Sequence, residues 1–134
     1  MKRKTPLILV VDDEIHILHV VKMKLANAGY EVITAEDGEE ALEIALQQQP
    51  DLIITDYQMP YLTGLDLCIA LKQHETTRTT PALMLTARGF SLARKHLDQT
   101  NICGVISKPF SPREILTRVV EQVEGEVSTW GHTP

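Results

Sequence analysis

Short runs of apolar residues recur along the chain and predict buried β-strands. Three of them, 7–11, 52–55 and 82–86, are continuous and rich in aliphatic residues, and a fourth lies around 105–106. Runs of this length that do not alternate with polar residues are typical of strands buried on both faces of a parallel sheet. The run 31–35 is more mixed, which predicts a strand at or near the edge of the sheet.

Between these runs lie segments whose apolar residues recur every three or four positions, which is the spacing of an amphipathic helix. The predicted helices cover 15–28, 39–49, 65–73 and 91–99, and a fifth begins at Ser111. Gly29 is the expected stop of the first helix. Ser111 is the expected N-cap of the fifth, with Pro112 in its first turn. Strands and helices therefore alternate, which predicts an open α/β sheet with helices on both faces.

The composition fits one globular domain. The chain has 134 residues, of which 43% are hydrophobic and 23% charged, and its net charge is -5. Basic residues are scattered, which argues against direct binding of nucleic acid. No apolar run approaches the roughly 20 residues that span a bilayer, so we expect no membrane association and a cytoplasmic location. Cys68 and Cys103 have apolar neighbours and are expected to be buried.

Residues 1–124 are expected to form the domain. Residues 125–134 are polar and contain Gly and Pro, which predicts a flexible tail. These residues are compatible both with a protein that acts alone and with one domain of a longer protein.

Polar residues follow the predicted strands where ligands bind in open α/β sheets, outside the carboxyl ends of the strands. They are Asp12 and Asp13 after the first strand, Asp56 after the third, Thr86 at the end of the fourth and Lys108 after the fifth. Each alone has an ordinary explanation, such as a helix cap, a turn residue or an exposed cation. Their convergence on one edge is hard to explain by chance and predicts a functional site. Glu36 and Asp37 follow the peripheral second strand and are not assigned to it.

Three carboxylates at one edge require a cation. Two carboxylates about 4 Å apart repel by roughly 4 kcal/mol at an effective dielectric constant near 20. Oxygen ligands suit Mg²⁺ or Mn²⁺ rather than zinc. An acidic pocket that binds such an ion, flanked by a lysine and a hydroxyl, is typical of phosphoryl chemistry. A carboxylate is then the natural nucleophile and would form an aspartyl phosphate.

The sequence resembles a response-regulator receiver domain over about residues 5–124. The motifs that carry the resemblance are Val10-Val-Asp-Asp-Glu14, Asp56-Tyr-Gln-Met-Pro60 with Gly64, Met84-Leu-Thr-Ala87 and Lys108-Pro-Phe110. The spacings from Asp56 to Thr86 and Lys108 agree with chemotaxis-type members of that family. The resemblance implies a flavodoxin-like, doubly wound sheet of five parallel strands in the order 2-1-3-4-5, with five helices.

The resemblance also implies how the acidic residues act. Asp56 would accept a phosphoryl group from a phosphohistidine on a sensor histidine kinase or a histidine-phosphotransfer protein. Asp13, Asp56 and the backbone carbonyl of Gln58 would bind Mg²⁺ or Mn²⁺, and Asp12 would act mainly through water. Such a domain is a switch rather than an enzyme, although it assists its own phosphorylation and slow dephosphorylation. Its output protein is not identified by the sequence.

Further residues surround the expected phosphoryl group. By the same resemblance, Lys108 would pair with it and Thr86 would hydrogen-bond it. Ala87 is small and would leave access to the pocket. Gln58 and Arg88 occupy the positions that tune the lifetime of the phosphorylated form.

Val105 departs from the family's pattern, because many members carry an aromatic residue there that moves inward with the threonine. A β-branched side chain is stiff and has no ring to relocate. Transmission to the face formed by the fourth helix, fifth strand and fifth helix is therefore expected to be muted or different.

Three other functions fit these residues less well than the switch. The departure at Val105 leaves open a docking scaffold that needs no phosphorylation. An aspartate-based phosphatase of the haloacid dehalogenase type is disfavoured by Gln58, because that chemistry needs a second acid there. A flavodoxin relative is disfavoured because no Ser/Thr/Gly-rich loop follows the first strand.

Overall fold

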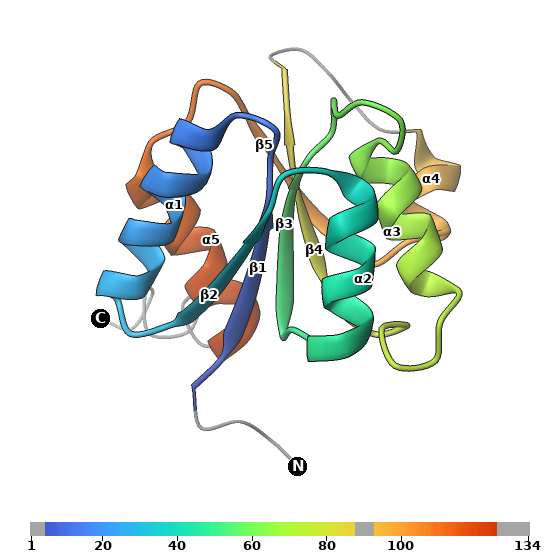
Figure 1. Ribbon diagram of the computed structural model, residues 1–134, viewed down its shortest axis with the longest axis horizontal. Coiled ribbons are helices and arrows are strands. Elements are labelled where there is room, and N and C mark those ends of the chain that lie inside the picture. Colours follow the sequence, from blue (N-terminus) through green and yellow to red (C-terminus); the bar gives the residue numbers. More distant parts are fainter. Residues whose placement is uncertain (1–4, 88–92, 126–134) are drawn as a thin grey trace.

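Strands and helices alternate in the computed structural model, which describes residues 5–87 and 93–125 (Figure 1). The strands are β1 (Leu7–Val11), β2 (Glu31–Ala35), β3 (Leu52–Asp56), β4 (Ala82–Thr86) and β5 (Ile102–Ser107). The helices are α1 (Ile15–Asn27), α2 (Gly38–Gln48), α3 (Gly64–Lys72), α4 (Arg94–Asp98) and α5 (Pro112–Glu124). The predicted alternation is confirmed. The helix predicted over 91–99 is shorter, and 88–92 lie outside the described residues.

All five strands are parallel and their order is β2-β1-β3-β4-β5. This confirms the flavodoxin-like, doubly wound sheet. The mixed segment β2 lies at one edge, as its composition predicts. The three central strands, β1, β3 and β4, are buried along their whole length.

Helices cover both faces of the sheet, with α1 and α5 on one side and α2, α3 and α4 on the other (Figure 1). Successive side chains of a strand point to opposite faces. Ile8 and Val10 of β1 therefore pack in the core beneath α1 and α5. Leu9 and Val11 pack in the core beneath α2 and α3. A strand between two cores needs apolar residues at every position, which explains the continuous runs.

Three helices begin with a side-chain cap at the carboxyl end of the sheet. The Asp37 side chain accepts from the Glu40 amide at 2.8 Å, and Ser111 accepts from the Glu114 amide at 3.1 Å, with Pro112 in the first turn. Thr63 starts α3 through a reciprocal capping box with Asp66. These caps fix the paths of the loops around the expected site, and Ser111 is in its predicted role.

One expectation fails at β5, the outer strand on the side of the sheet away from β2. Cys68 of α3 is buried as expected, but Cys103 is exposed. It is the residue left without a partner where the register of β5 shifts against β4, between the pairs of Ile102 and Gly104. Within the described residues, no helix combines the length and the apolar character needed to cross a membrane. The tail expected over 125–134 lies, beyond Gly125, outside the described part.

Candidate functional site

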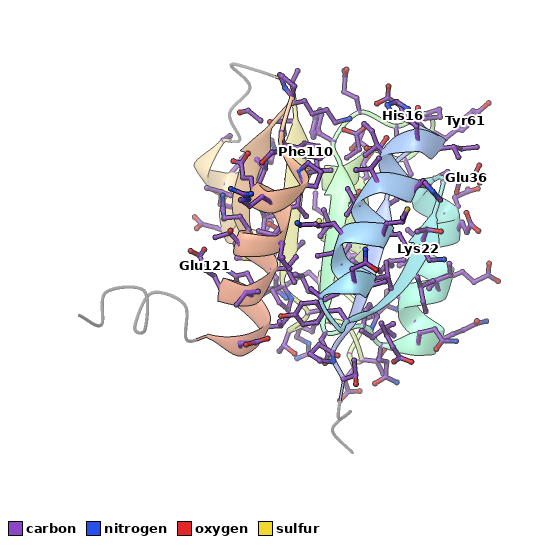
Figure 2. All side chains as sticks on the ribbon, turned by 90° about the vertical axis from the view of Figure 1, so that its left-hand side faces the viewer. His16, Lys22, Glu36, Tyr61, Phe110 and Glu121 are labelled. Atoms are coloured by element: carbon purple, nitrogen blue, oxygen red, sulfur yellow. The ribbon has the colours of Figure 1, made fainter. Side chains whose placement is uncertain are left out.

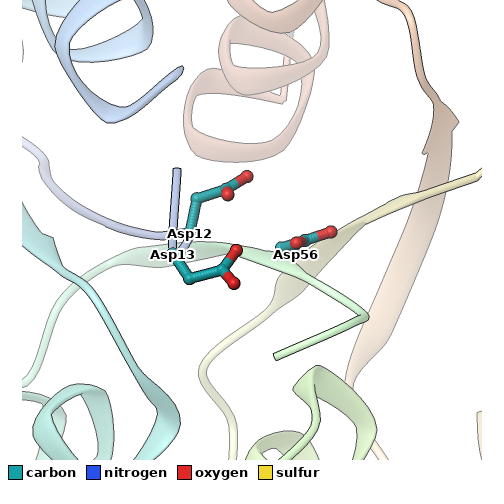
Figure 3. A group of neighbouring side chains, drawn as sticks. All are labelled: Asp12, Asp13 and Asp56. Carbon is teal, nitrogen blue, oxygen red and sulfur yellow. The ribbon is translucent and has the colours of Figure 1, made fainter. Parts of the chain in front are cut away.

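Three aspartates meet at the carboxyl ends of β1 and β3 (Figure 3). Asp12 and Asp13 follow β1 directly, and Asp56 is the last residue of β3. One carboxylate oxygen from each lies within 4.8 Å of the others. Asp12 is 0% and Asp56 6% exposed, whereas Asp13 is exposed to solvent. The structure thus brings together three acids that the sequence places at the ends of two strands.

Backbone hydrogen bonds hold Asp12 in place. Its own amide donates to the carbonyl of Ala35 at 3.2 Å, which ties it to the end of β2. Its carboxylate accepts from the amide of Glu14 at 2.9 Å. These two hydrogen bonds therefore fix the position of Asp12 in the turn from β1 into α1.

Lys108 extends its ammonium group into the acidic cluster from the end of β5. The Nζ atom lies 3.3 Å from Asp12 Oδ2, 3.3 Å from Asp56 Oδ1 and 3.6 Å from Glu14 Oε1. Its backbone amide donates to the carbonyl of Thr86 at 2.7 Å, and the bond to Pro109 is cis. One cation thus faces several carboxylates, and the site as a whole is acidic.

Burial and crowding shift the ionisation of these groups. Burial, followed by the nearby charge of Asp12, raises the pKa of Asp56 to about 6, despite the opposing effect of Lys108. Burial also raises the pKa of Asp12. For Lys108, burial alone would lower the pKa, but the carboxylates of Asp12 and Asp56 together raise it. The lysine is charged at neutral pH, and the two buried aspartates lose their protons less readily than exposed ones.

The side chain of Thr86 is 1% exposed, and its hydroxyl has no hydrogen-bond partner within the described residues. Leaving such a group unpaired costs about 1–3 kcal/mol. An unpaired hydroxyl at the end of β4, beside the strand that carries Asp56, is suited to a ligand that brings an acceptor.

Gly64 allows α3 to start against the end of β3. A Cβ atom at this position would collide with the carbonyl oxygen of Asp56 and lie 2.9 Å from the sulfur of Met84. The Gly64 amide donates to the carbonyl of Tyr57 at 2.9 Å and closes the loop. The glycine of the Asp56 motif is therefore explained by close backbone approach.

The structure places some of the other residues that the sequence analysis discussed, but not all of them. Gln58 and Ala87 line the groove that contains Asp56. Asp37 is a helix cap, which agrees with its exclusion from the site. Val105 is half-buried on β5, and its expected effect on transmission stays a prediction. Arg88 lies outside the described residues.

Glu14 was missed by the reasoning from sequence, although it contacts Lys108. The signal available was weak. Glutamate stands directly before α1, where Ser, Thr, Asp or Asn is the usual cap. Sequence spacing does not determine where a long side chain points, so the contact between Glu14 and Lys108 could not be predicted.

The three aspartates fit a hard divalent cation. Their clustered donor atoms are all carboxylate oxygens, which is the donor type of Mg²⁺ and Mn²⁺ sites. Two of the carboxylates are buried and the third is exposed. A cation would relieve their mutual repulsion and still keep contact with water.

Comparisons with known proteins agree with this arrangement. The family model described as response regulator receiver domain matches residues 8–120. The transcriptional regulatory protein PhoP for alkaline phosphatase synthesis, from Bacillus subtilis, is 43% identical over 112 residues, which is 84% of this chain and 46% of that protein. The chain thus spans about half the length of the curated relatives it matches.

Two solved structures are similar over most of the chain. The chemotaxis response regulator CheY4 of Vibrio cholerae is 36% identical with a TM-score of 0.80, over 87% of this chain and 97% of that one. The receiver domain of sensor histidine kinase PA1611 from Pseudomonas aeruginosa is 29% identical with a TM-score of 0.77, over 90% and 98%. That structure is described as having a magnesium ion coordinated in its active site cleft.

Proposed function

Because the chain belongs to the response regulator receiver domain family, we propose that it is a phosphorylation switch whose phosphoacceptor is Asp56. One observation carries the proposal. The Asp56 carboxylate lies 3.3 Å from the Lys108 ammonium and clusters with the carboxylates of Asp12 and Asp13. A carboxylate placed beside a cation and a cluster of metal-binding oxygens suits nucleophilic attack on phosphorus.

The donor is proposed to be a phosphohistidine on a sensor histidine kinase or a histidine-phosphotransfer protein. An oxygen of Asp56 forms a bond to phosphorus while the phosphorus–nitrogen bond breaks. The leaving imidazole nitrogen keeps the electron pair and takes up a proton. Lys108 then pairs with a phosphoryl oxygen, and the unpaired hydroxyl of Thr86 donates to another.

Asp12, Asp13, Asp56 and the backbone carbonyl of Gln58 would hold Mg²⁺ or Mn²⁺. When bound, that ion supplies positive charge that neutralises the phosphoryl oxygens and the crowded carboxylates. The burial of Asp12 and Asp56 keeps water away from one side of the site and strengthens its charge interactions.

A groove of about 760 Å³ gives a donor protein access to Asp56. Its walls include Ile17 and Val20 of α1, Phe110 and Pro112. Figure 2 shows Phe110 and His16, which also lines the groove, at the same end of the molecule. An apolar wall beside a charged centre suits a macromolecular donor, because contacts away from the reacting atoms can orient the phosphohistidine.

The chain would act as a signalling switch rather than as an enzyme, and its reaction would take place in the cytoplasm. Its output would pass to another protein through a changed contact surface. Relatives such as PhoP are transcriptional regulators about twice as long as this chain. We expect no direct contact between these 134 residues and nucleic acid.

Phosphorylation can be tested with acetyl phosphate and Mg²⁺, followed by intact-protein mass spectrometry. The unchanged protein should gain one phosphoryl group, and Asp56→Asn should gain none. Chelation of divalent metal should stop the reaction. Absence of phosphorylation under saturating donor and metal would instead favour the scaffold that acts without phosphate. Modification that persists in Asp56→Asn would contradict the assignment of the acceptor.

A further inference from the structure

Glu14 occupies the N-cap position of α1 without capping the helix. Its side chain makes no hydrogen bond to the first turn of α1. Instead, its Oε1 atom lies 3.6 Å from Lys108 Nζ. Helix capping therefore does not explain why the Glu14 carboxylate points towards Lys108.

Glu14 differs from the three aspartates that it accompanies. It is not among the three residues whose oxygens cluster closely enough to share a metal ion. Its side chain is 51% exposed, and it lines the same groove as Asp56 and Lys108. A bound cation would compensate the aspartates, whereas Glu14 would still present its negative charge at the entrance to Lys108.

We propose that Glu14 is a specificity-determining residue that disfavours small, highly charged phosphodonors by competing with their phosphoryl oxygens for Lys108. This inference rests on the proposed function of Asp56. The carboxylate of Glu14 stands beside Lys108 in the groove that an incoming phosphoryl group would enter. A small dianion has little besides charge with which to bind, so it meets the full repulsion. A donor protein gains additional contacts along the apolar wall formed by Ile17, Val20 and Phe110.

A purely structural role for Glu14 makes a different prediction. A carboxylate at a helix N-terminus can stabilise the helix through its dipole. Loss of that effect would change stability but would treat all phosphodonors alike. If the effect of Glu14 on the phosphorylation rate depends on the charge of the donor, Glu14 selects donors rather than merely stabilising the helix.

The test compares Glu14→Gln with the unchanged protein at saturating Mg²⁺. Acetyl phosphate, a dianion at neutral pH, and phosphoramidate, which carries one negative charge fewer, serve as donors. We expect Glu14→Gln to become phosphorylated about two- to fivefold faster than the unchanged protein with acetyl phosphate, which is the size expected for one partly exposed charge. The acceleration with phosphoramidate should be smaller. The difference should vanish at about 1 M salt, where the Debye length is about 3 Å.

Glu43→Gln is the matched control, because Glu43 is an exposed glutamate of α2 outside the groove. It should leave both rates unchanged. Equal acceleration with both donors, or none with either, would overturn the role of Glu14. Failure of the unchanged protein to be phosphorylated would instead overturn the proposed function of Asp56.

A second measurement needs neither metal nor phosphodonor. Thermal unfolding in a chelator can be compared for Glu14→Gln in the unchanged background and in Lys108→Met. We expect Glu14→Gln to lower the melting temperature when Lys108 is present, because the ion pair is lost. The loss should be smaller or reversed in Lys108→Met, where Glu14 only repels the aspartates. Equal losses in both backgrounds would overturn the contact on which the inference depends.

Discussion

Asp56 shows how a single residue can be favourable for function and unfavourable for folding. Its carboxylate is almost fully buried beside Asp12, and its pKa is raised to about 6 from an ordinary value of 3.8. The folded protein therefore binds this proton more tightly than the unfolded chain does. The contribution of Asp56 to stability should fall as the pH rises from about 4 to about 6, because the folded state must then hold a poorly solvated charge.

Replacing Asp56 by asparagine should raise the stability of the metal-free protein at neutral pH. A pKa change of about two units corresponds to at most about 3 kcal/mol. The gain should be small near pH 4 and reach its full size above pH 6. Urea unfolding in a chelator at both pH values measures it. Asp98→Asn, at an exposed position on α4, is the control, and a gain independent of pH would contradict the electrostatic explanation.

At the scale of elements, the start of α3 determines where Asp56 can lie. The helix begins against the carbonyl of the last residue of β3, and only a residue without Cβ fits there. The capping box of Thr63 and Asp66 fixes the same turn from the helix side. The position of the proposed nucleophile is thus set by the packing of two consecutive elements.

Gly64→Ala should therefore affect stability and phosphorylation together. Overpacking costs about 1–3 kcal/mol, and a shift of the Asp56 backbone should slow phosphorylation. Gly29→Ala is the control, because Gly29 has φ of +103° but no atom near a would-be Cβ. It should lose about 1 kcal/mol through backbone strain alone. Urea unfolding and acetyl phosphate kinetics measure both effects, and unchanged kinetics in Gly64→Ala would contradict the positioning argument.

At the scale of the whole molecule, the sheet gathers residues far apart in the sequence. Asp12 and Lys108 lie 3.3 Å apart although 96 positions separate them along the chain. Parallel strands place all carboxyl ends at one edge, so residues that follow different strands become neighbours. A ligand at this edge should therefore stabilise the entire fold.

Mg²⁺ should raise the melting temperature, and the gain should grow with the logarithm of the metal concentration above the dissociation constant. Saturation at about 100 times the dissociation constant would add about 2.7 kcal/mol. Asp13→Ala should lose most of this response, because it removes one of the three clustered ligands. Glu39→Ala, an exposed acid on α2, should retain it. A metal response of equal size in Asp13→Ala would contradict the metal assignment.

Much of this arrangement could be predicted because its causes are local. Apolar runs predict the central strands, and Ser111 with Pro112 predicts the start of α5, since those features depend on neighbouring residues. The order of the sheet came from family resemblance rather than from residue pattern. The exposure of Cys103 and the direction of Glu14 could not be predicted, because both depend on which surfaces meet after folding.

Successive residues of each central strand pack in different cores, and this limits which insertions and deletions homologous proteins can accept. Inserting or deleting one residue within β3 would exchange the faces of the side chains that follow it in the strand and turn Asp56 away from Asp12 and Lys108. Length variation should therefore be tolerated in connecting loops and excluded from the central strands. A homologue that gains or loses one residue inside β3 would be expected to have abandoned phosphotransfer.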